Sequence, residues 1–194
     1  MDDKLQPRQQ DTTGEIVSYW LNSDNRIVRV SKLWNQFALA NEGSKELLSP
    51  EIQGRSVFEF IIGDQTRMYL EALLQNARFL NHAVNRSYRC DSPTLKRYMS
   101  MTIQPTQEGL VQLNHTLLKT EPQEQELIYC HAPTPEYGAV PRCSVCTRLL
   151  IKGTWLSPED AKILGLLVPC KPLPVTYRIC PSCRRRQPRM PTRG

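Results

Sequence analysis

Two cysteine pairs near the C-terminus have the residue types and the spacing of a metal site. Cys143 and Cys146 form one C-x-x-C pair, and Cys180 and Cys183 form the other. A spacer of two residues lets a tight turn aim both thiolates of a pair at one ion. The 33 residues between the pairs are enough for a hairpin or small helix that folds back and brings the four sulfurs together. The sequence therefore predicts a four-cysteine metal centre.

Zinc is the metal that this set of donors favours. Zn²⁺ binds four thiolates in a closed tetrahedral shell and has no ligand-field preference of its own. Iron in a rubredoxin-like site is the alternative. A catalytic zinc keeps one position open for water, and four cysteines leave none. We therefore expect a structural ion and not a catalytic one.

Two other interpretations of the cysteines remain open. A single C-x-x-C can be a redox dithiol, but this leaves the second pair unexplained. Disulfides are the other alternative, yet the chain has seven cysteines, an odd number, and begins with polar residues instead of the apolar core of a secretory signal. No run approaches the ~20 apolar residues that span a bilayer. These features predict a reducing, cytoplasmic location without membrane contact.

Basic charge is concentrated in the part of the chain that carries these pairs. The net charge is +6, and residues 121–194 have 11 basic side chains against 6 acidic ones. The densest cluster is Arg184, Arg185 and Arg186, directly after the last cysteine of the site. Such a cluster can bind nucleic-acid phosphates or a protein partner, although it can equally be a solvated chain end. Residues 187–194 are predicted to be a disordered basic tail.

The first two thirds of the chain alternate strand and helix patterns. Residues 1–13 are polar and lack periodicity, which predicts a disordered leader. The expected elements are strands at 15–21 and 26–30, a short helix from Ser31 to about Gly43, a helical turn after Gly54, a helix capped by Asp64 and ending near residue 80, and strands at 83–90, 96–103 and 109–118. The fold class is therefore α+β, with two strands, several helices and then three antiparallel strands.

Several local motifs accompany this order of elements. Asp24-Asn25-Arg26-Ile27 occupies the first hairpin, Trp34 and Phe37 lie on the first helix, and Gly54-Arg55-Ser56-Val57-Phe58 opens the next. With these motifs, residues 14–118 resemble a PAS sensor domain. The resemblance implies an antiparallel five-stranded sheet with helices on one face.

The C-terminal part carries motifs of its own beside the cysteine pairs. They are a Gly153-Thr154-Trp155 turn and a helical stretch at 157–162. Residues 140–186 thus resemble a four-cysteine, zinc-ribbon-like module found beside PAS domains in bacterial signalling proteins. That module usually has Thr-His-Gly where this chain has Thr176-Tyr177-Arg178, so a histidine contact is not expected here. The acidic, proline-containing segment 119–139 is predicted to be a linker.

The ligand of the PAS-like domain stays open. A PAS fold surrounds a cavity that in some members holds haem, flavin or a metabolite, and in others only side chains. In flavin-binding light sensors of this family a reactive cysteine follows the glycine turn, and the matching position here is Val57. A haem sensor would need an axial ligand, for which His82 is the best placed of the three histidines. A redox sensor could use Cys90 beside Arg89, although a buried cysteine is commonly an inert apolar residue.

The sequence contains no catalytic motif of the common kinds. It has no phosphate loop, nucleophile elbow or His-Glu metal signature. We therefore expect a non-enzymatic cytoplasmic signalling or regulatory protein, whose PAS-like domain binds a ligand or forms a homodimer and whose zinc module docks on a protein partner. One alternative is a PAS-regulated DNA- or RNA-binding protein that uses the zinc module and Arg184 to Arg186. A second alternative is a redox or haem sensor.

Overall fold

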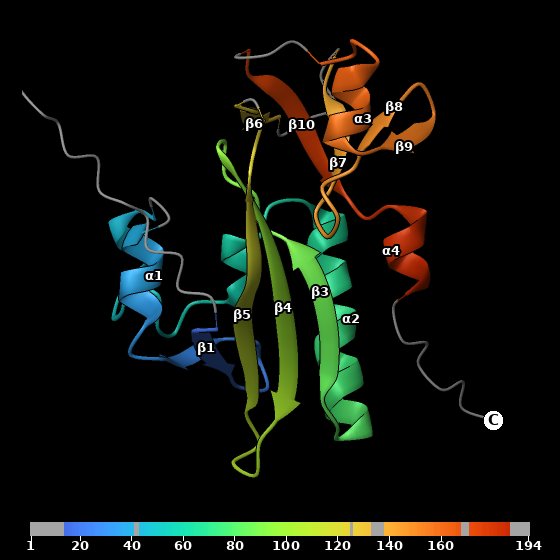
Figure 1. Ribbon diagram of the computed structural model, residues 1–194. Helices are drawn as coiled ribbons and strands as arrows, with labels where there is room; N and C mark the ends of the chain where they lie inside the picture. The colour runs from blue at the N-terminus through green and yellow to red at the C-terminus, as the bar shows by residue number, and fades with distance from the viewer. Residues whose placement is uncertain (1–13, 41–42, 125, 133–137, 168–170, 187–194) are drawn as a thin grey trace, which may run out of the picture.

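Two five-stranded sheets make up the protein. The computed structural model describes residues 14–40, 43–124, 126–132, 138–167 and 171–186. The predicted leader, 1–13, and the predicted tail, 187–194, lie outside the described residues. The second sheet lies beyond one end of the long strands of the first (Figure 1). The class is therefore α+β, as predicted.

The first sheet is antiparallel throughout. Its strand order is β2-β1-β5-β4-β3. The bounds are β1 Ile16–Leu21, β2 Ile27–Val30, β3 Val84–Arg89, β4 Leu95–Pro105 and β5 Val111–Pro122. β1 pairs with β5, the last strand of this sheet along the chain, so β2 and β3 lie at its two edges. This arrangement confirms the predicted antiparallel five-stranded sheet.

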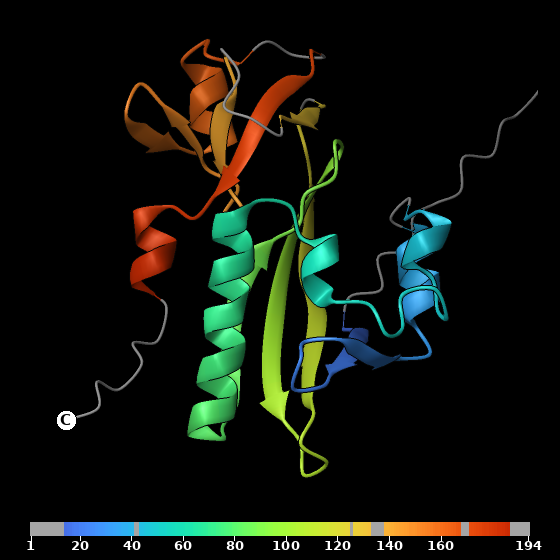
Figure 2. The same cartoon turned by 180° about the vertical axis from the view of Figure 1, so that it is seen from behind.

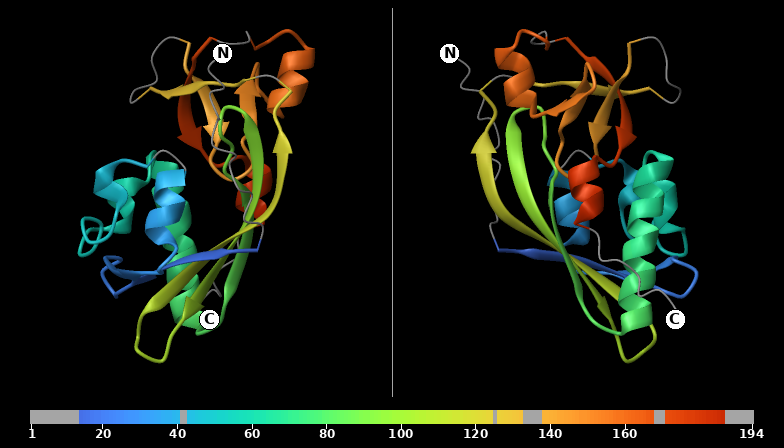
Figure 3. Two further views of the ribbon diagram at one scale, coloured as in Figure 1. Left: turned by 60° about the vertical axis from the view of Figure 1, so that its left-hand side comes forward. Right: turned by 90° about the vertical axis from the view of Figure 1, so that its right-hand side faces the viewer.

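Helices cover one face of this sheet. They are α1 Trp34–Ala40 and α2 Asp64–Leu80, with short 3-10 turns η1 Lys45–Leu47 and η2 Val57–Phe60 between them. The view from behind shows α2 in front of the sheet, and the side views place α1 and α2 on the same side of it (Figures 2 and 3). The cap of α2 differs from the prediction: Gly63 holds that position and Asp64 is the first helical residue.

The core of the first sheet comes from the amphipathic pattern of α2. Leu70, Leu73, Leu74 and Ala77 recur at helical spacing and are buried against the sheet. They pack against Ile103 and other inward-facing strand residues, and this contact removes their apolar surface from water.

The turn that opens η2 is held close to the first hairpin. Gly54 has a φ of +80° and donates its N–H to the carbonyl oxygen of Ile27 at 2.7 Å. Ile27 in turn donates to the carbonyl of Arg55 at 2.9 Å. Ser56 then caps the helical turn in a reciprocal pair with Glu59. The tight backbone approach predicted at Gly54 is therefore present.

The second sheet is mixed. Its order is β6-β10-β7-β8-β9, with β10 parallel to both β6 and β7. The bounds are β6 Tyr129–His131, β7 Val140–Cys143, β8 Leu149–Ile151, β9 Thr154–Leu156 and β10 Leu173–Arg178. The helix predicted near 157–162 is α3 Pro158–Ile163, and the Ser157 hydroxyl accepts its capping hydrogen bond from Asp160 N–H at 3.0 Å. A short helix, α4 Pro181–Arg185, follows β10.

The segment expected to be a linker, 119–139, carries strands of both sheets. β5 continues to Pro122, which pairs with Leu95, and β6 joins the second sheet. The prediction of a linker was therefore wrong for these described residues. Its polar side chains have no apolar periodicity, but backbone hydrogen bonds form a strand without needing one. Residues 125 and 133–137 lie outside the described part of the chain.

Across the described residues, no helix combines the length and apolar character needed to cross a membrane.

Candidate metal centre

The first cysteine pair lies in a tight turn between β7 and β8. Cys143 ends β7, and its N–H donates to the carbonyl of Arg148 at 2.7 Å. Thr147 closes the turn: its N–H donates to the carbonyl of Cys143 at 2.9 Å, and its φ is +63°. The Thr147 hydroxyl also donates to the carbonyl of Cys146 at 2.7 Å. These hydrogen bonds direct both thiols to the same side of the turn.

The second pair lies where β10 leads into α4. Cys180 is the N-cap residue of α4, and Pro181 begins the helix, a position where a missing N–H costs nothing. Cys183 lies one turn further, and its N–H donates to the sulfur of Cys180 at 3.5 Å. The strand that precedes this pair is tied to the first turn, because Ser144 N–H donates to the carbonyl of Arg178 at 2.9 Å.

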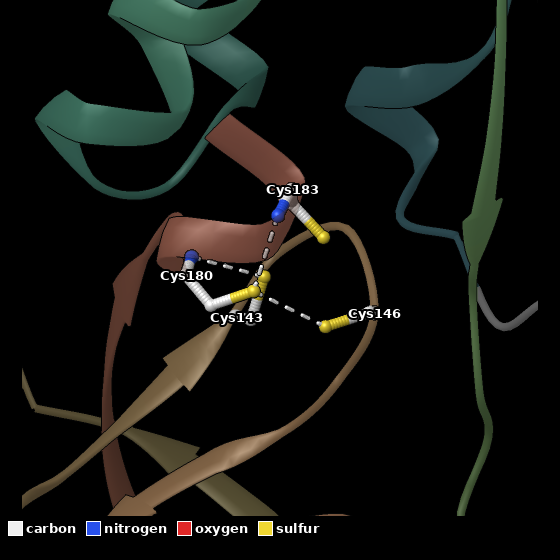
Figure 4. Close-up of side chains that lie close together, drawn as sticks. All are labelled: Cys143, Cys146, Cys180 and Cys183. Carbon is white, nitrogen blue, oxygen red and sulfur yellow. Dashed lines mark hydrogen bonds between the residues drawn. The ribbon is translucent and has the colours of Figure 1, made fainter. Parts of the chain in front are cut away.

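All four sulfurs converge on one point, as Figure 4 shows. The four Sγ atoms lie within 4.8 Å of one another, and those of Cys146 and Cys180 are 3.6 Å apart. A tetrahedral zinc with Zn–S bonds of about 2.3 Å requires sulfurs ~3.8 Å apart. Cys143, Cys180 and Cys183 are buried and Cys146 is half-buried, so little solvent reaches the site. The predicted set of four cysteines is therefore brought together with the spacing of a metal centre.

The electrostatics of the cluster also fit a cation. Hydrogen bonds from the thiols of Cys146 and Cys183 hold the pKa of Cys143 well below its usual range. The hydrogen bond to Cys143 raises the pKa of Cys146 to about 11, and the pKa of Cys183 is raised for the same reason. Sulfurs this close therefore share protons, and a divalent cation would take the place of those protons.

Backbone donors further suit the sulfurs to act as thiolate ligands. Cys180 N–H donates to the sulfur of Cys143 at 3.4 Å, in addition to the bond that Cys183 makes to Cys180. Hydrogen bonds of this kind orient a thiolate ligand and stabilise its charge. Ile179, Tyr69, Val145 and Trp155 pack around the cluster and complete its apolar surroundings.

The metal centre is in direct contact with the first sheet. Arg89, at the end of β3, donates its N–H to the carbonyl of Val145 at 2.9 Å. The hydroxyls of Thr66 on α2 and of Ser144 are hydrogen-bonded at 2.6 Å. Ile179 N–H donates to the side-chain oxygen of Gln65 at 3.3 Å. Each of the two cysteine turns is therefore attached to an element of the PAS-like region.

Gly63 allows a close approach between the backbones of the two regions. A Cβ at this position would lie 3.0 Å from the Cβ of Tyr177 and 3.1 Å from its carbonyl oxygen. The φ of Gly63 is +88°, a conformation that other residues rarely adopt. A larger side chain here would push β10 away from the start of α2.

The arginine cluster predicted as a contact surface lies next to this centre. Arg184 and Arg185 belong to α4 and Arg186 follows it, and all three side chains are exposed. None of them forms an ion pair with another described residue. Together they form a positively charged surface at the end of α4.

The residues considered for haem or redox sensing are not brought to this site. His82 is exposed beyond the end of α2, whereas His115 on β5 is half-buried and is hydrogen-bonded to the Tyr88 hydroxyl at 2.9 Å. The choice of His82 as the best-placed axial ligand was therefore wrong. Cys90 keeps an exposed surface, but the protein atoms crowded around its sulfur raise the pKa of its thiol. Burial of His115 was not evident from the sequence, although its place in an alternating strand was a usable signal.

Comparison with known proteins finds a distant structural similarity. No family model and no curated protein matches the chain. Among solved structures, the chain is similar to the crystal structure of a sensory box sensor histidine kinase from Vibrio cholerae, with a TM-score of 0.38 and 13% sequence identity. The similarity covers 53% of this chain and 81% of that chain. The PAS interpretation therefore rests on the order of the elements and on the sequence motifs.

Proposed function

We propose that this chain is a non-enzymatic signalling or regulatory protein of the cytoplasm, in which a PAS-like region is joined to a structural zinc centre that presents a surface to a protein partner. The observation that carries the proposal is the convergence of four cysteine sulfurs within 4.8 Å at the joint between the two sheets. Zinc is proposed because four thiolates complete its tetrahedral shell.

The size of the surrounding structure supports a structural role for the ion. The turn that carries Cys143 and Cys146 and the helix α4 bury few apolar side chains beyond the cysteines themselves. A region of this size rarely folds on its apolar core alone, and metal binding can replace the missing burial. The proposed zinc therefore holds α4 and the first turn together.

The position of the centre supports a signalling role. A change in the PAS-like region that shifts the start of α2 or the end of β3 would move the two cysteine turns. Thr66 and Arg89 bond directly to the first turn, and Gln65 accepts a hydrogen bond from Ile179, next to the second. With no catalytic group proposed for the chain, the change would reach a partner through surface contacts.

Elemental analysis of the purified protein tests this proposal. We expect about one zinc per chain, and loss of the metal to a strong chelator should expose residues 140–186 to protease while residues 14–118 stay protected. Iron would instead give a visible absorption band. A metal-free protein in which the chelator changes nothing would refute the proposal.

The exposed arginines favour a second candidate function, which is binding of DNA or RNA. Arg184, Arg185 and Arg186 lie together beside the proposed zinc, and counterion release would make their binding to nucleic acid strongest at low salt. Electrophoretic mobility shifts at low salt, compared between the wild type and a variant with all three changed to glutamine, test it. Absence of any shift would exclude this function.

A further inference from the structure

Strand β3 has a free edge beside the metal centre. Among the described residues β3 pairs with β4 alone, and no strand covers its other side. An uncovered edge presents backbone donors and acceptors to any other chain that can extend beside it. Proteins commonly protect such edges, so an open one next to a functional site is a candidate for partner binding.

The hydrogen-bond pattern identifies which groups point outward. Cys90 N–H donates to the carbonyl of Arg97 on β4, whereas Arg89 N–H points away from β4 and donates to Val145. Because this direction alternates along an antiparallel strand, the backbone groups of Ser87 and Asn85 also point away from β4. The N–H and carbonyl of Ser87 have no partner among the described residues.

The bond between Arg89 and Val145 shows that this edge accepts another backbone. The cysteine turn occupies the last position of the edge and leaves Ser87 open, while the carbonyl of Asn85 accepts a hydrogen bond from Nη1 of Arg86 at 2.6 Å that an incoming strand would displace. Figures 1 and 3 show α4 on the same side of the molecule as β3 and α2. An incoming strand would therefore continue a pairing that the cysteine turn begins.

A groove of about 480 Å³ lies along this edge. Its walls include residues 85–89 of β3, Tyr69 of α2, and Cys146 and Cys183 of the metal centre. A volume of this size lies in the range of specific ligand sites. The groove therefore gives the side chains of an added strand a place to pack.

The arginines of the groove favour an acidic partner. Its lining contains three arginines, Arg86, Arg89 and Arg186, and no carboxylate, and its negative groups are the sulfurs of Cys146 and Cys183, whose charge a bound zinc would partly neutralise. Arg89 is neutralised by Asp91 at 2.6 Å. Arg86 donates from Nη1 to the carbonyl of Asn85 at 2.6 Å, whereas its Nε and Nη2 are buried without a hydrogen-bond partner among the described residues. The Tyr69 hydroxyl also interacts with Arg86, but burial raises the pKa of Tyr69, so it brings no negative charge. An incoming carboxylate that Arg86 turns to meet would supply the missing acceptor and opposite charge.

We propose that the free edge of β3, with the basic groove beside it, binds an extended acidic segment of a protein partner as an added strand. This inference rests on the proposed function, because it names the kind of partner that the protein docks on. The backbone of the segment would pair with Ser87, and alternate acidic side chains would reach Arg86 and Arg186. The affinity would fall with added salt, because the two arginines contribute through charge.

A labelled peptide of about six residues that alternates glutamate and valine is the probe for this site. Fluorescence anisotropy with the purified, metal-containing protein should show binding, at least tenfold tighter than for a peptide with lysine in place of glutamate. Amide exchange at Ser87 should slow when the peptide is bound. Equal binding of the lysine peptide, or protection elsewhere with Ser87 unchanged, would overturn the proposal.

Two substitutions at one position test the backbone pairing. Ser87→Pro removes the outward N–H without breaking a bond to β4, and proline is tolerated at the edge of a sheet. It should weaken peptide binding about fivefold, the worth of one hydrogen bond, while Ser87→Ala should bind as the wild type does. Unchanged metal content and circular dichroism in both variants would show that the fold is intact. If Ser87→Pro binds like Ser87→Ala, strand addition is wrong.

Charge variants test the partner class. Arg86→Gln and Arg186→Gln should each weaken binding about two- to fivefold, and Arg29→Gln, on the opposite edge strand, should not. Tighter binding of a single-stranded oligonucleotide that protects Ser87, or self-association of the chain through this edge in sedimentation, would assign the edge to another occupant and overturn the proposal. A protein that holds zinc but fails to bind the peptide would refute this inference alone, whereas a protein without metal would refute the proposed function.

Discussion

The two sheets have the same number of strands but are stabilised in different ways. The first sheet buries a continuous apolar core beneath α2, from Tyr19 at one side to Val84 at the other. The second divides its buried residues between a small apolar cluster around Leu149 and Val175 and a separate cluster made largely of cysteines. A region with too little apolar area to fold alone needs another source of stability, and four converging sulfurs offer one.

Ion pairs and a backbone hydrogen bond connect the two regions where the sheets meet. Lys96 and Arg89 of the first region both contact Glu159 of α3, at 2.7 and 3.7 Å. Leu127 N–H donates to the carbonyl of Pro93 at 3.2 Å. The region with the cysteine cluster therefore contacts the region with the larger apolar core, and if a metal holds the cluster, its loss should first destabilise residues 140–186.

Replacing a ligand of the metal centre should have the largest effect. Cys143→Ser removes a fully buried thiol, and we expect loss of the metal and unfolding of residues 140–186, because structural zinc contributes roughly 10–16 kcal/mol in small domains. Metal content and limited proteolysis measure both. Cys130→Ser, an exposed cysteine on β6, is the matched control. A Cys143→Ser protein that keeps its metal would contradict the division between the two regions.

A cavity in the first core should destabilise the other side of the comparison. Leu74 is fully buried, and Leu74→Ala should lower the free energy of unfolding of the first region by about 2–5 kcal/mol without changing the metal content of the folded protein. Urea denaturation followed by tryptophan fluorescence measures the change. Leu39→Ala, at a 61% exposed residue, should cost little. Loss of metal at the same urea concentration as the fluorescence change, in the wild type and in Leu74→Ala alike, would show that the two regions are not separate in stability.

The buried histidine should make the first region sensitive to acid. Burial lowers the pKa of His115 to about 4 from its ordinary 6.5, so the folded state resists protonation and stability falls as pH drops from 6.5 towards 4. Between pH 7 and 5 the loss should be about 2 kcal/mol. His115→Phe should remove this part of the pH dependence and His82→Gln should not, as measured by denaturation at each pH. A His115→Phe variant with an unchanged pH profile would contradict this assignment.

The joint itself should give the smallest effect. Gly63→Ala combines an unfavourable φ of +88° with a close contact to Tyr177, whereas Gly109→Ala has a similar φ of +74° and open space around its Cβ. Both variants should lose about 1 kcal/mol of stability through backbone strain. The further loss in Gly63→Ala, seen in thermal melts with and without chelator, measures how strongly the regions are coupled. Equal losses in the two variants would mean that the joint is not tight.

Much of the first sheet was predictable because its signals are local. The apolar stripe of α2 and the alternating strands follow the periods of helix and strand, so their bounds were close to those observed. The extension of β5 to Pro122 was missed because polar strand residues carry no such period. β6 was missed because its three residues are too few for a pattern. Among the described residues it pairs with β10 alone, which is distant in the sequence.

The sequence by itself determined the donor set, since the spacing within each cysteine pair is a property of one tight turn. It did not determine what lies beside that set. Only the tertiary structure shows that Thr66 and Arg89 bond to the first cysteine turn and that Gly63 lies against β10. It also shows that the free edge of β3 faces the groove. These contacts join residues that are far apart in the chain, and each depends on backbone position, for which neither residue type nor periodicity provides a signal.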